Sequence, residues 1–149
     1  MKAMNEMKLT FPSRSANEAF ARAAVASFIA QLDPAVDELA DIRTAVSEAV
    51  TNSIVHAYPD SIGSITIQAK LFASGRVVIK VKDHGCGIED VEKAMEPLFT
   101  TGGEDRSGLG FSVMESFSDR LKVSSKKGKG TTVTLEKYIA LRERKTGAL

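Results

Sequence analysis

A carboxylate and an amide stand four residues apart in the segment SEAVTNSIVHAY, residues 47–58. In a helix, Glu48 and Asn52 at this spacing project side by side. A carboxylate can accept a proton or orient a hydroxyl, and an amide oxygen is a ligand that Mg²⁺ uses together with phosphate oxygens and water. Taken alone, the pair is more often solvated surface, so its meaning depends on the rest of the chain.

A glycine-broken segment, DHGCG at residues 83–87, follows a predicted strand. Asp83 at the strand end could accept a hydrogen bond from an exocyclic amine such as that of adenine. Gly85 and Gly87 let the backbone approach a flat ligand closely. A tight turn with a capping aspartate explains the segment equally well when it is read alone. His84 and Cys86 do not suggest a metal pair, because no further ligand stands at a usable spacing.

A second glycine segment, RSGLGF at residues 106–111, ends a long loop and opens a helix. Its free N–H groups would lie at the positive end of the helix dipole and could hold phosphate, although a flexible helix entry is the alternative. Arg106 could neutralise a terminal phosphate, and the preceding threonines and glycines could close as a lid. The residues assigned to this part of a nucleotide site are Thr100, Thr101, Arg106, Ser107, Gly108 and Gly110.

The segment GKGTT at residues 128–132 most simply forms a hairpin turn, from which Thr131 could add a hydrogen bond to a bound base. Other nucleotide-binding patterns are missing. The chain has no G-x-x-x-x-G-K-[ST] segment, no third glycine in a Rossmann turn and no protein-kinase H-R-D or D-F-G.

Composition predicts one soluble domain over residues 1–149, with about 1–6 and 140–149 flexible. The chain has 20 Lys and Arg against 19 Asp and Glu, so its net charge of +1 gives no support to nucleic-acid or membrane binding. The single Cys86 rules out an internal disulfide and a cysteine-based zinc site, and a cytoplasmic location is expected. No stretch has the length of a transmembrane helix or the pattern of a signal peptide.

The hydrophobic periodicity predicts an α+β sandwich, with helices on one face of a mixed, mainly antiparallel sheet. A first helix is expected from a Ser15–Glu18 capping box, burying Phe20, Ala24, Phe28 and Leu32. A longer helix should follow, capped by Asp33 and reaching about residue 56. Strands are expected at 6–12, 64–73, 76–83, 120–127 and 131–138, with short helices near 90–95 and 109–119.

The four motifs in this order resemble those of the GHKL ATPase/kinase superfamily. They are E-x-x-x-N, D-x-G-x-G, G-x-G and G-x-G-T, and they extend over most of the chain. The resemblance implies a Bergerat fold, a two-layer α/β sandwich that holds ATP between its helices and a lid. The compact chain, with its segments FPSRSANEAFAR and EPLFTT, is most similar to the anti-sigma factor/serine kinase branch and its RsbW-type relatives.

That resemblance implies a homodimer that sequesters a sporulation sigma factor of the sigma F type. It also implies ATP- and Mg²⁺-dependent phosphorylation of an anti-anti-sigma factor on serine. Carried onto this sequence, Glu48 would be the general base, Asn52 the Mg²⁺ ligand and Asp83 the adenine contact. The alternatives are a nucleotide-gated binding module without phosphotransfer and a stand-alone ATPase. The polar side of the first helix is a candidate partner surface, with a solvated face as the alternative: Arg14, Glu18 and Arg22.

Overall fold

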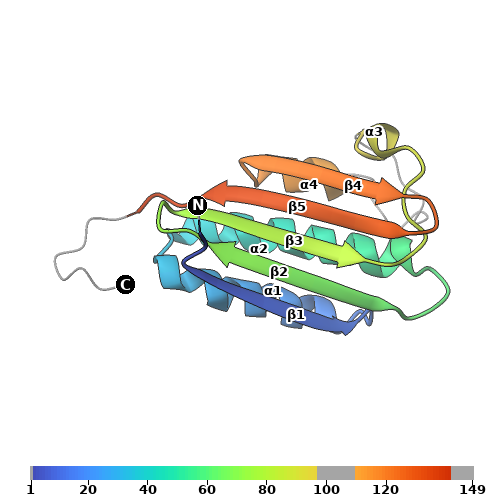
Figure 1. Cartoon of the computed structure of the whole chain (residues 1–149), viewed down its shortest axis with the longest axis horizontal. Coiled ribbons are helices and arrows are strands. Elements are labelled where there is room, and N and C mark those ends of the chain that lie inside the picture. Colours follow the sequence, from blue (N-terminus) through green and yellow to red (C-terminus); the bar gives the residue numbers. More distant parts are fainter. Residues whose placement is uncertain (1, 97–109, 142–149) are drawn as a thin grey trace.

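The computed structural model describes residues 2–96 and 110–141, which form an α+β sandwich built on a five-stranded sheet. Figure 1 shows the sheet in front with α1, α2 and α4 behind it, so one sheet face is covered and the other is open. This arrangement confirms the predicted fold class. All four strand pairings are antiparallel, so the described sheet has no parallel part. In sheet order the strands are β1 (Asn5–Pro12), β2 (Ser64–Leu71), β3 (Arg76–Asp83), β5 (Gly130–Tyr138) and β4 (Arg120–Lys126).

Two long helices make up most of the second layer. Helix α1 (Asn17–Ile29) runs into a short 3₁₀ turn, η1 (Ala30–Leu32). Helix α2 (Val36–Asn52) continues into a single π-helical segment, η2 (Ser53–Ala57). The shorter helices are α3 (Val91–Ala94), which lies beyond β4 in Figure 1, and α4 (Gly110–Ser116). No helix within the described ranges is long and apolar enough to cross a lipid bilayer.

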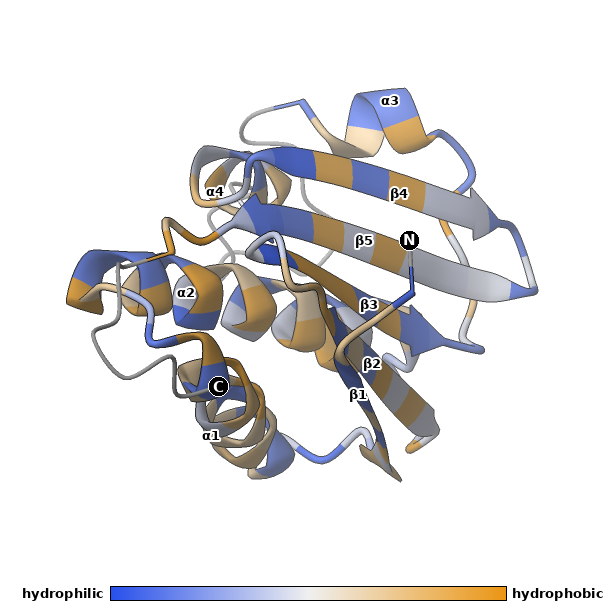
Figure 2. Cartoon of the chain, turned by 60° about the vertical axis from the view of Figure 1, so that its left-hand side comes forward, coloured by the Kyte–Doolittle hydropathy of each residue, from blue (hydrophilic) through white to orange (hydrophobic). Residues whose placement is uncertain are grey.

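The core lies between the two layers, where alternate strand residues meet the apolar side of the helices (Figure 2). Strand β2 shows the alternation clearly, because Ile65, Ile67, Ala69 and Leu71 are all fully buried while the residues between them are not. Burial of one such large aliphatic side chain stabilises the fold by roughly 1.5–3 kcal/mol. The core therefore holds α2, and the polar residues that α2 carries, in a fixed place against the sheet.

The expected details of the first helix are wrong in two respects. Its buried stripe is Ala21, Val25 and Ile29, whereas Phe20 is 52% exposed and packs edge-to-face on Phe11 at the rim of the core. Leu32 is buried as predicted, in the turn η1, and Phe28 is half-buried against the core. The predicted capping box does not form either, because no side chain caps α1. Glu18 reaches across to the hydroxyl of Ser47 on α2 instead, which joins the two helices.

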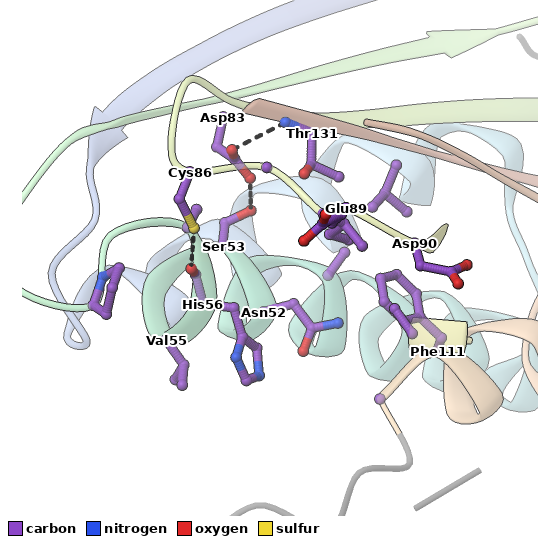
Figure 3. A pocket seen from close by; sticks show the side chains of 18 of the residues that line it. Asn52, Ser53, Val55, His56, Asp83, Cys86, Glu89, Asp90, Phe111 and Thr131 are labelled. Carbon is purple, nitrogen blue, oxygen red and sulfur yellow. Dashed lines mark hydrogen bonds between the residues drawn. The ribbon is translucent and has the colours of Figure 1, made fainter. Parts of the chain in front are cut away.

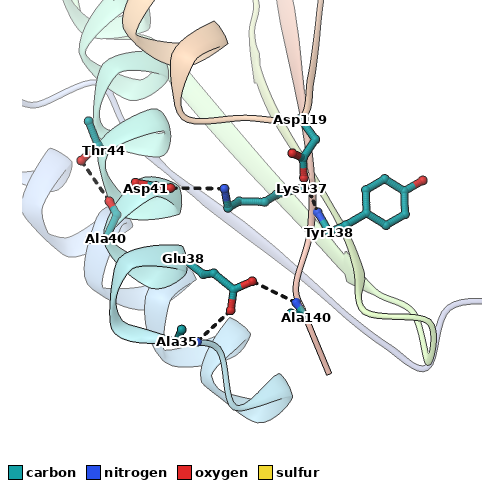
Figure 4. Close-up of polar contacts among 9 residues, drawn as sticks. All are labelled: Ala35, Glu38, Ala40, Asp41, Thr44, Asp119, Lys137, Tyr138 and Ala140. Atoms are coloured by element: carbon teal, nitrogen blue, oxygen red, sulfur yellow. Dashed lines mark hydrogen bonds and ion pairs between the residues drawn. The ribbon is translucent and has the colours of Figure 1, made fainter. Parts of the chain in front are cut away.

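The start of α2 also differs from the expectation, although the helix itself is confirmed. Asp33 adopts a left-handed conformation with φ of 50°, and the cap position is Ala35. The carboxylate of Glu38 accepts hydrogen bonds from the backbone N–H of Ala35 at 2.8 Å and of Ala140 at 2.9 Å (Figure 4). The Glu38 side chain thus provides a hydrogen-bond acceptor for the backbone N–H at the start of α2. It also links this end of the helix to the segment that follows β5.

A second contact fixes the same end of α2 to the sheet. The ammonium of Lys137 on β5 lies 3.3 Å from the carboxylate of Asp41 (Figure 4). At the N-terminal edge, β1 begins at Asn5, so Asn5 and Glu6, which were expected to precede the first strand or to open it, are paired with β2. The sheet and α2 together form the rigid frame on which the candidate site is built.

Candidate functional site

A cavity of about 750 Å³ opens where α2 and η2 meet the ends of β3 and β5 (Figure 3). The loop after β3 and the start of α4 form its other walls. Five residues predicted from sequence line it: Asn52, Asp83, Gly87, Gly110 and Thr131. A cavity of this volume, bounded by apolar side chains and a few polar groups, is typical of a site for a nucleotide-sized ligand.

Asp83 is the most firmly held polar group of the cavity. Its side chain is buried, with 3% of the residue exposed, and three hydrogen bonds hold its carboxylate. One oxygen, Oδ1, accepts from the backbone N–H of Gly85 at 3.0 Å and of Thr131 at 3.1 Å. The other, Oδ2, accepts from the hydroxyl of Ser53 at 3.0 Å. The carboxylate is therefore an oriented acceptor at the cavity wall.

The π-helical segment η2 shapes the adjoining wall. A π turn widens the helix and leaves backbone carbonyls without their usual helical partners. Here the carbonyl of Ala57 accepts from the N–H of Cys86 at 3.0 Å, and the carbonyl of His56 accepts from the Cys86 thiol at 3.0 Å. These contacts dock the loop after β3 onto the helix layer, so both walls of the cavity are held together.

The glycines of this loop serve close packing between backbone segments. A Cβ on Gly85 would lie 2.3 Å from the carbonyl oxygen of Ala57, and one on Gly87 would lie 2.1 Å from that of Lys126. Gly130 has φ of +105°, and a Cβ there would lie 2.2 Å from the carbonyl oxygen of Asp83. Only glycine permits these approaches without displacement of the chain.

Glu48 and Asn52 meet at the first residue of α4. A Cβ on Gly110 would lie 3.1 Å from Oδ1 of Asn52 and 3.4 Å from Oε2 of Glu48. Both side chains are half-buried, and their one-turn spacing on α2 brings them to the same place. A carboxylate and an amide thus stand together at the start of α4, next to the segment that was predicted to hold phosphate.

Thr131 lies at the base of the cavity and is linked to a serine that sequence analysis did not single out. Its hydroxyl lies 2.7 Å from the hydroxyl of Ser125 on β4. Ser125 also accepts a hydrogen bond from the N–H of Ile88 at 2.7 Å. The loop after β3 is therefore anchored on the β4–β5 hairpin as well as on η2.

The structure brings together most of the predicted site and leaves part of it untested. Asn52, Asp83, Gly87, Gly110 and Thr131 line the cavity. Glu48 is not one of its lining residues and reaches only its edge at Gly110. Gly85 supports the loop without lining the cavity. Five predicted residues lie outside the described parts of the chain: Thr100, Thr101, Arg106, Ser107 and Gly108.

Several residues that line the cavity were not predicted from the sequence. Ser53, His56, Ile88 and Phe111 all line the cavity. Ser53 follows Asn52 directly, but an isolated serine in a helix carries no signal of what it contacts. Phe111 sits within the predicted RSGLGF segment, and its apolar ring beside a glycine-rich helix start was the available signal.

Among the predicted partner residues, Glu18 is held by two contacts. It accepts from Ser47, and its carboxylate lies 3.8 Å from Nη1 of Arg22. Arg14 is exposed just before α1. The three residues therefore lie at one end of α1, and Glu18 connects this end to the residue that precedes Glu48.

The described residues contain no group of three or more His, Cys, Asp or Glu side chains that could hold a metal ion by themselves. Asn52 supplies a single amide oxygen beside the Glu48 carboxylate. That donor set suits Mg²⁺ held mainly by phosphate oxygens and water, because Mg²⁺ commonly takes only one or two protein ligands.

Comparison with known proteins gives consistent results. Residues 11–137 match the family described as histidine kinase-like ATPase domain. The anti-sigma F factor of Thermoanaerobacter sp. (strain X514) is 58% identical over 141 residues, which are 93% of this chain and 97% of the relative. That of Geobacillus kaustophilus (strain HTA426) is 53% identical over 137 residues, or 91% of this chain and 94% of the relative.

Solved structures share the fold. The RsbU and RsbW domains of a Mycobacterium tuberculosis protein superpose with a TM-score of 0.69 at 22% identity, over 95% of this chain and 34% of that one. This chain thus spans about a third of that longer chain. The histidine kinase domain of an Erythrobacter litoralis blue-light activated kinase gives a TM-score of 0.57 at 22% identity, over 82% of this chain and 60% of that one.

Proposed function

Because this chain belongs to the histidine kinase-like ATPase domain family, among the anti-sigma F factors, we propose that it is an ATP-dependent anti-sigma factor and protein serine kinase. It sequesters a sporulation sigma factor of the sigma F type. It also transfers the γ-phosphate of ATP to a serine of the anti-anti-sigma factor that opposes it.

The observation that carries this proposal is the convergence of Glu48 and Asn52 on Gly110, at the edge of a cavity that contains Asp83. The cavity thus has an oriented acceptor in its wall at Asp83, and at its edge the Asn52 amide lines it with the Glu48 carboxylate close by at Gly110. The exocyclic amine of a nucleobase can donate a hydrogen bond to Asp83. The Glu48 carboxylate can accept the proton that a hydroxyl loses during phosphate transfer. This polarity fits a purine nucleotide whose base lies at Asp83 and whose phosphates extend toward α4.

In the proposed transfer, the serine hydroxyl oxygen of the partner forms a bond to the γ-phosphorus. The bond between that phosphorus and the β,γ-bridging oxygen breaks, and ADP leaves with the electron pair. The hydroxyl proton passes to the carboxylate of Glu48. A positioned general base of this kind contributes about 10²- to 10⁴-fold to the rate.

Mg²⁺ fits the site through the amide oxygen of Asn52 and would neutralise charge on the phosphates when bound. The remaining tasks belong to the protein itself. Asp83 orients the adenine, and Gly110 leaves room for the phosphates of the nucleotide. Thr131 forms part of the cavity floor.

Partner binding is proposed for the end of α1 that carries Arg14, Glu18 and Arg22. Glu18 connects this surface to Ser47, which directly precedes Glu48 in α2. A partner that docks there would bind next to α2, the helix that also carries the proposed general base. A homodimer is part of the same proposal, as the family resemblance implies.

Three measurements on one preparation test the proposal: retention of a sporulation sigma factor in gel filtration with ATP, transfer of label from γ-labelled ATP to an anti-anti-sigma serine, and ATP turnover by the protein alone. The proposal predicts sigma factor retention and labelling of the anti-anti-sigma serine, with little ATP turnover by the protein alone. Sigma retention without label on the partner would favour a nucleotide-gated binding module. Rapid turnover without partners would favour a stand-alone ATPase.

A further inference from the structure

The acceptor at the cavity wall is oriented by a side chain from the neighbouring helical segment. Ser53, the first residue of η2, donates from Oγ to Oδ2 of Asp83 across 3.0 Å. Both residues are buried, with 5% of Ser53 and 3% of Asp83 exposed. The other carboxylate oxygen is held by backbone N–H groups of Gly85 and Thr131. Within the described residues, the Asp83 carboxylate therefore accepts hydrogen bonds at both of its oxygens.

We propose that Ser53 is a positioning residue that sets the base selectivity of the cavity, by holding Asp83 as an acceptor for the exocyclic amine of adenine. This inference rests on the proposed binding of ATP and names which residue tunes it. It predicts preference for a 6-amino purine over purines that lack that amine.

The reason lies in how a carboxylate is fixed in space. The final torsion of an aspartate side chain is broad, so anchoring one oxygen alone does not set the direction of the other. The two backbone donors hold Oδ1, and Ser53 supplies the anchor on Oδ2. With both oxygens held, an incoming amine meets an acceptor that needs no further ordering, and preorganisation of this kind favours binding.

The same arrangement rejects the wrong base. A 6-oxo purine presents a carbonyl oxygen where the carboxylate requires a donor, which would leave two buried acceptors facing each other. A purine without a substituent at this position avoids the repulsion but forms no bond to Asp83. The amine-free analogue therefore isolates the contact that Ser53 is proposed to support.

The test compares dissociation constants for ATP and for purine riboside triphosphate, which lacks the 6-amine, measured by titration calorimetry with Mg²⁺. The proteins are wild type, Ser53→Ala, Ser53→Thr and Ser124→Ala, the last an exposed serine on β4. We expect Ser53→Ala to raise the dissociation constant for ATP about tenfold, as for loss of a hydrogen bond to a charged group. The dissociation constant for purine riboside triphosphate should change by no more than about twofold, because this nucleotide makes no hydrogen bond to the Asp83 carboxylate that Ser53 orients.

Ser53→Thr keeps the hydroxyl and should restore selectivity, while Ser124→Ala should behave as wild type. Equal weakening of both nucleotides by Ser53→Ala would show a general structural effect and overturn the inference, as would unchanged or tighter ATP binding. If wild type binds ATP and only this pattern fails, the proposed function stands. If wild type binds neither nucleotide, the nucleotide site and this inference fail together.

Discussion

Glu48 and Asn52 reach the same point at the start of α4, where a Cβ on Gly110 would lie 3.4 Å from the Glu48 carboxylate and 3.1 Å from the Asn52 amide oxygen. These two side chains are one helical turn apart on α2 and separated from Gly110 by more than fifty residues. The proposed general base, the proposed Mg²⁺ ligand and the proposed phosphate-binding segment are therefore in contact range of one another.

Gly110→Ala should impair phosphotransfer without destabilising the fold. The added methyl group would crowd both side chains, since it would lie 3.1–3.4 Å from their polar atoms. Gly110 is the first residue of α4 and not an interior position, so helix propensity contributes little there and the melting temperature should change only slightly. Transfer of γ-labelled phosphate and thermal unfolding, with Ser116→Ala at the other end of α4 as control, measure the two effects. Full activity of Gly110→Ala would show that Glu48 and Asn52 do not act at this point.

Gly130→Ala and Gly128→Ala form a matched pair on the β4–β5 turn. Both glycines have positive φ, of +105° and +79°, so each substitution costs roughly 1–2 kcal/mol from the backbone alone. Only Gly130 would also bring its Cβ to 2.2 Å from the carbonyl oxygen of Asp83, while nothing lies within 4 Å at Gly128. Denaturant unfolding should therefore show a larger loss for Gly130→Ala. Equal losses of unfolding free energy for the two variants would mean that the close approach of Gly130 to the Asp83 carbonyl does not limit stability.

Glu136 should make stability depend on pH in the acid range. The hydrogen bond from the Arg76 guanidinium, 2.7 Å away, lowers the pKa of Glu136 below its usual 4.5, aided by the Tyr138 hydroxyl and the charge of Arg120. As pH falls below 4.5, the unfolded chain takes up this proton first, so the folded state loses its advantage until Glu136 is protonated as well.

The matching variant is Glu136→Gln, which removes the charge and keeps the shape. Wild type should be more stable than Glu136→Gln at pH 7, and the difference in unfolding free energy should shrink between pH 4.5 and pH 3. Denaturant titrations at pH 7, 4.5 and 3 measure it. A difference that stays constant over this range would contradict the assigned role of the Arg76–Glu136 pair.

Arg22→Ala should weaken partner binding and leave nucleotide binding unchanged. Arg22 is partly exposed on α1, does not line the cavity, and lies 3.8 Å from the Glu18 carboxylate. Surface plasmon resonance with a sporulation sigma factor, and calorimetry with ATP, separate the two effects. Lys129→Ala, on the exposed β4–β5 turn, is the control. Unchanged sigma affinity would place the partner surface elsewhere.

Much of the fold could be predicted because the hydrophobic period changes visibly along the chain. Strand β2 alternates between buried and less buried residues, and α2 keeps its apolar stripe at Ile42, Val46 and Val50. The errors fell where tertiary contacts override local signals. Glu18 bonds to Ser47 and does not cap α1, and Phe20 lies exposed against Phe11.

The site was partly predictable for a similar reason. Glu48, Asn52 and Asp83 belong to motifs whose order along the chain is specific, and the family match confirms that resemblance. Ser53 and Ser125 belong to no motif. Their roles depend on the π turn of η2 and on strand register, which place them beside Asp83 and Thr131. Such pairings across the fold leave no local pattern.

The most direct test of the whole account is label transfer from γ-labelled ATP to the serine of an anti-anti-sigma factor, with wild type and Glu48→Gln compared side by side. The account predicts labelled phosphoserine with wild type. With Glu48→Gln it predicts a rate lower by about 10²- to 10⁴-fold while ATP still binds. Absence of label with wild type, or an undiminished rate with Glu48→Gln, would contradict it.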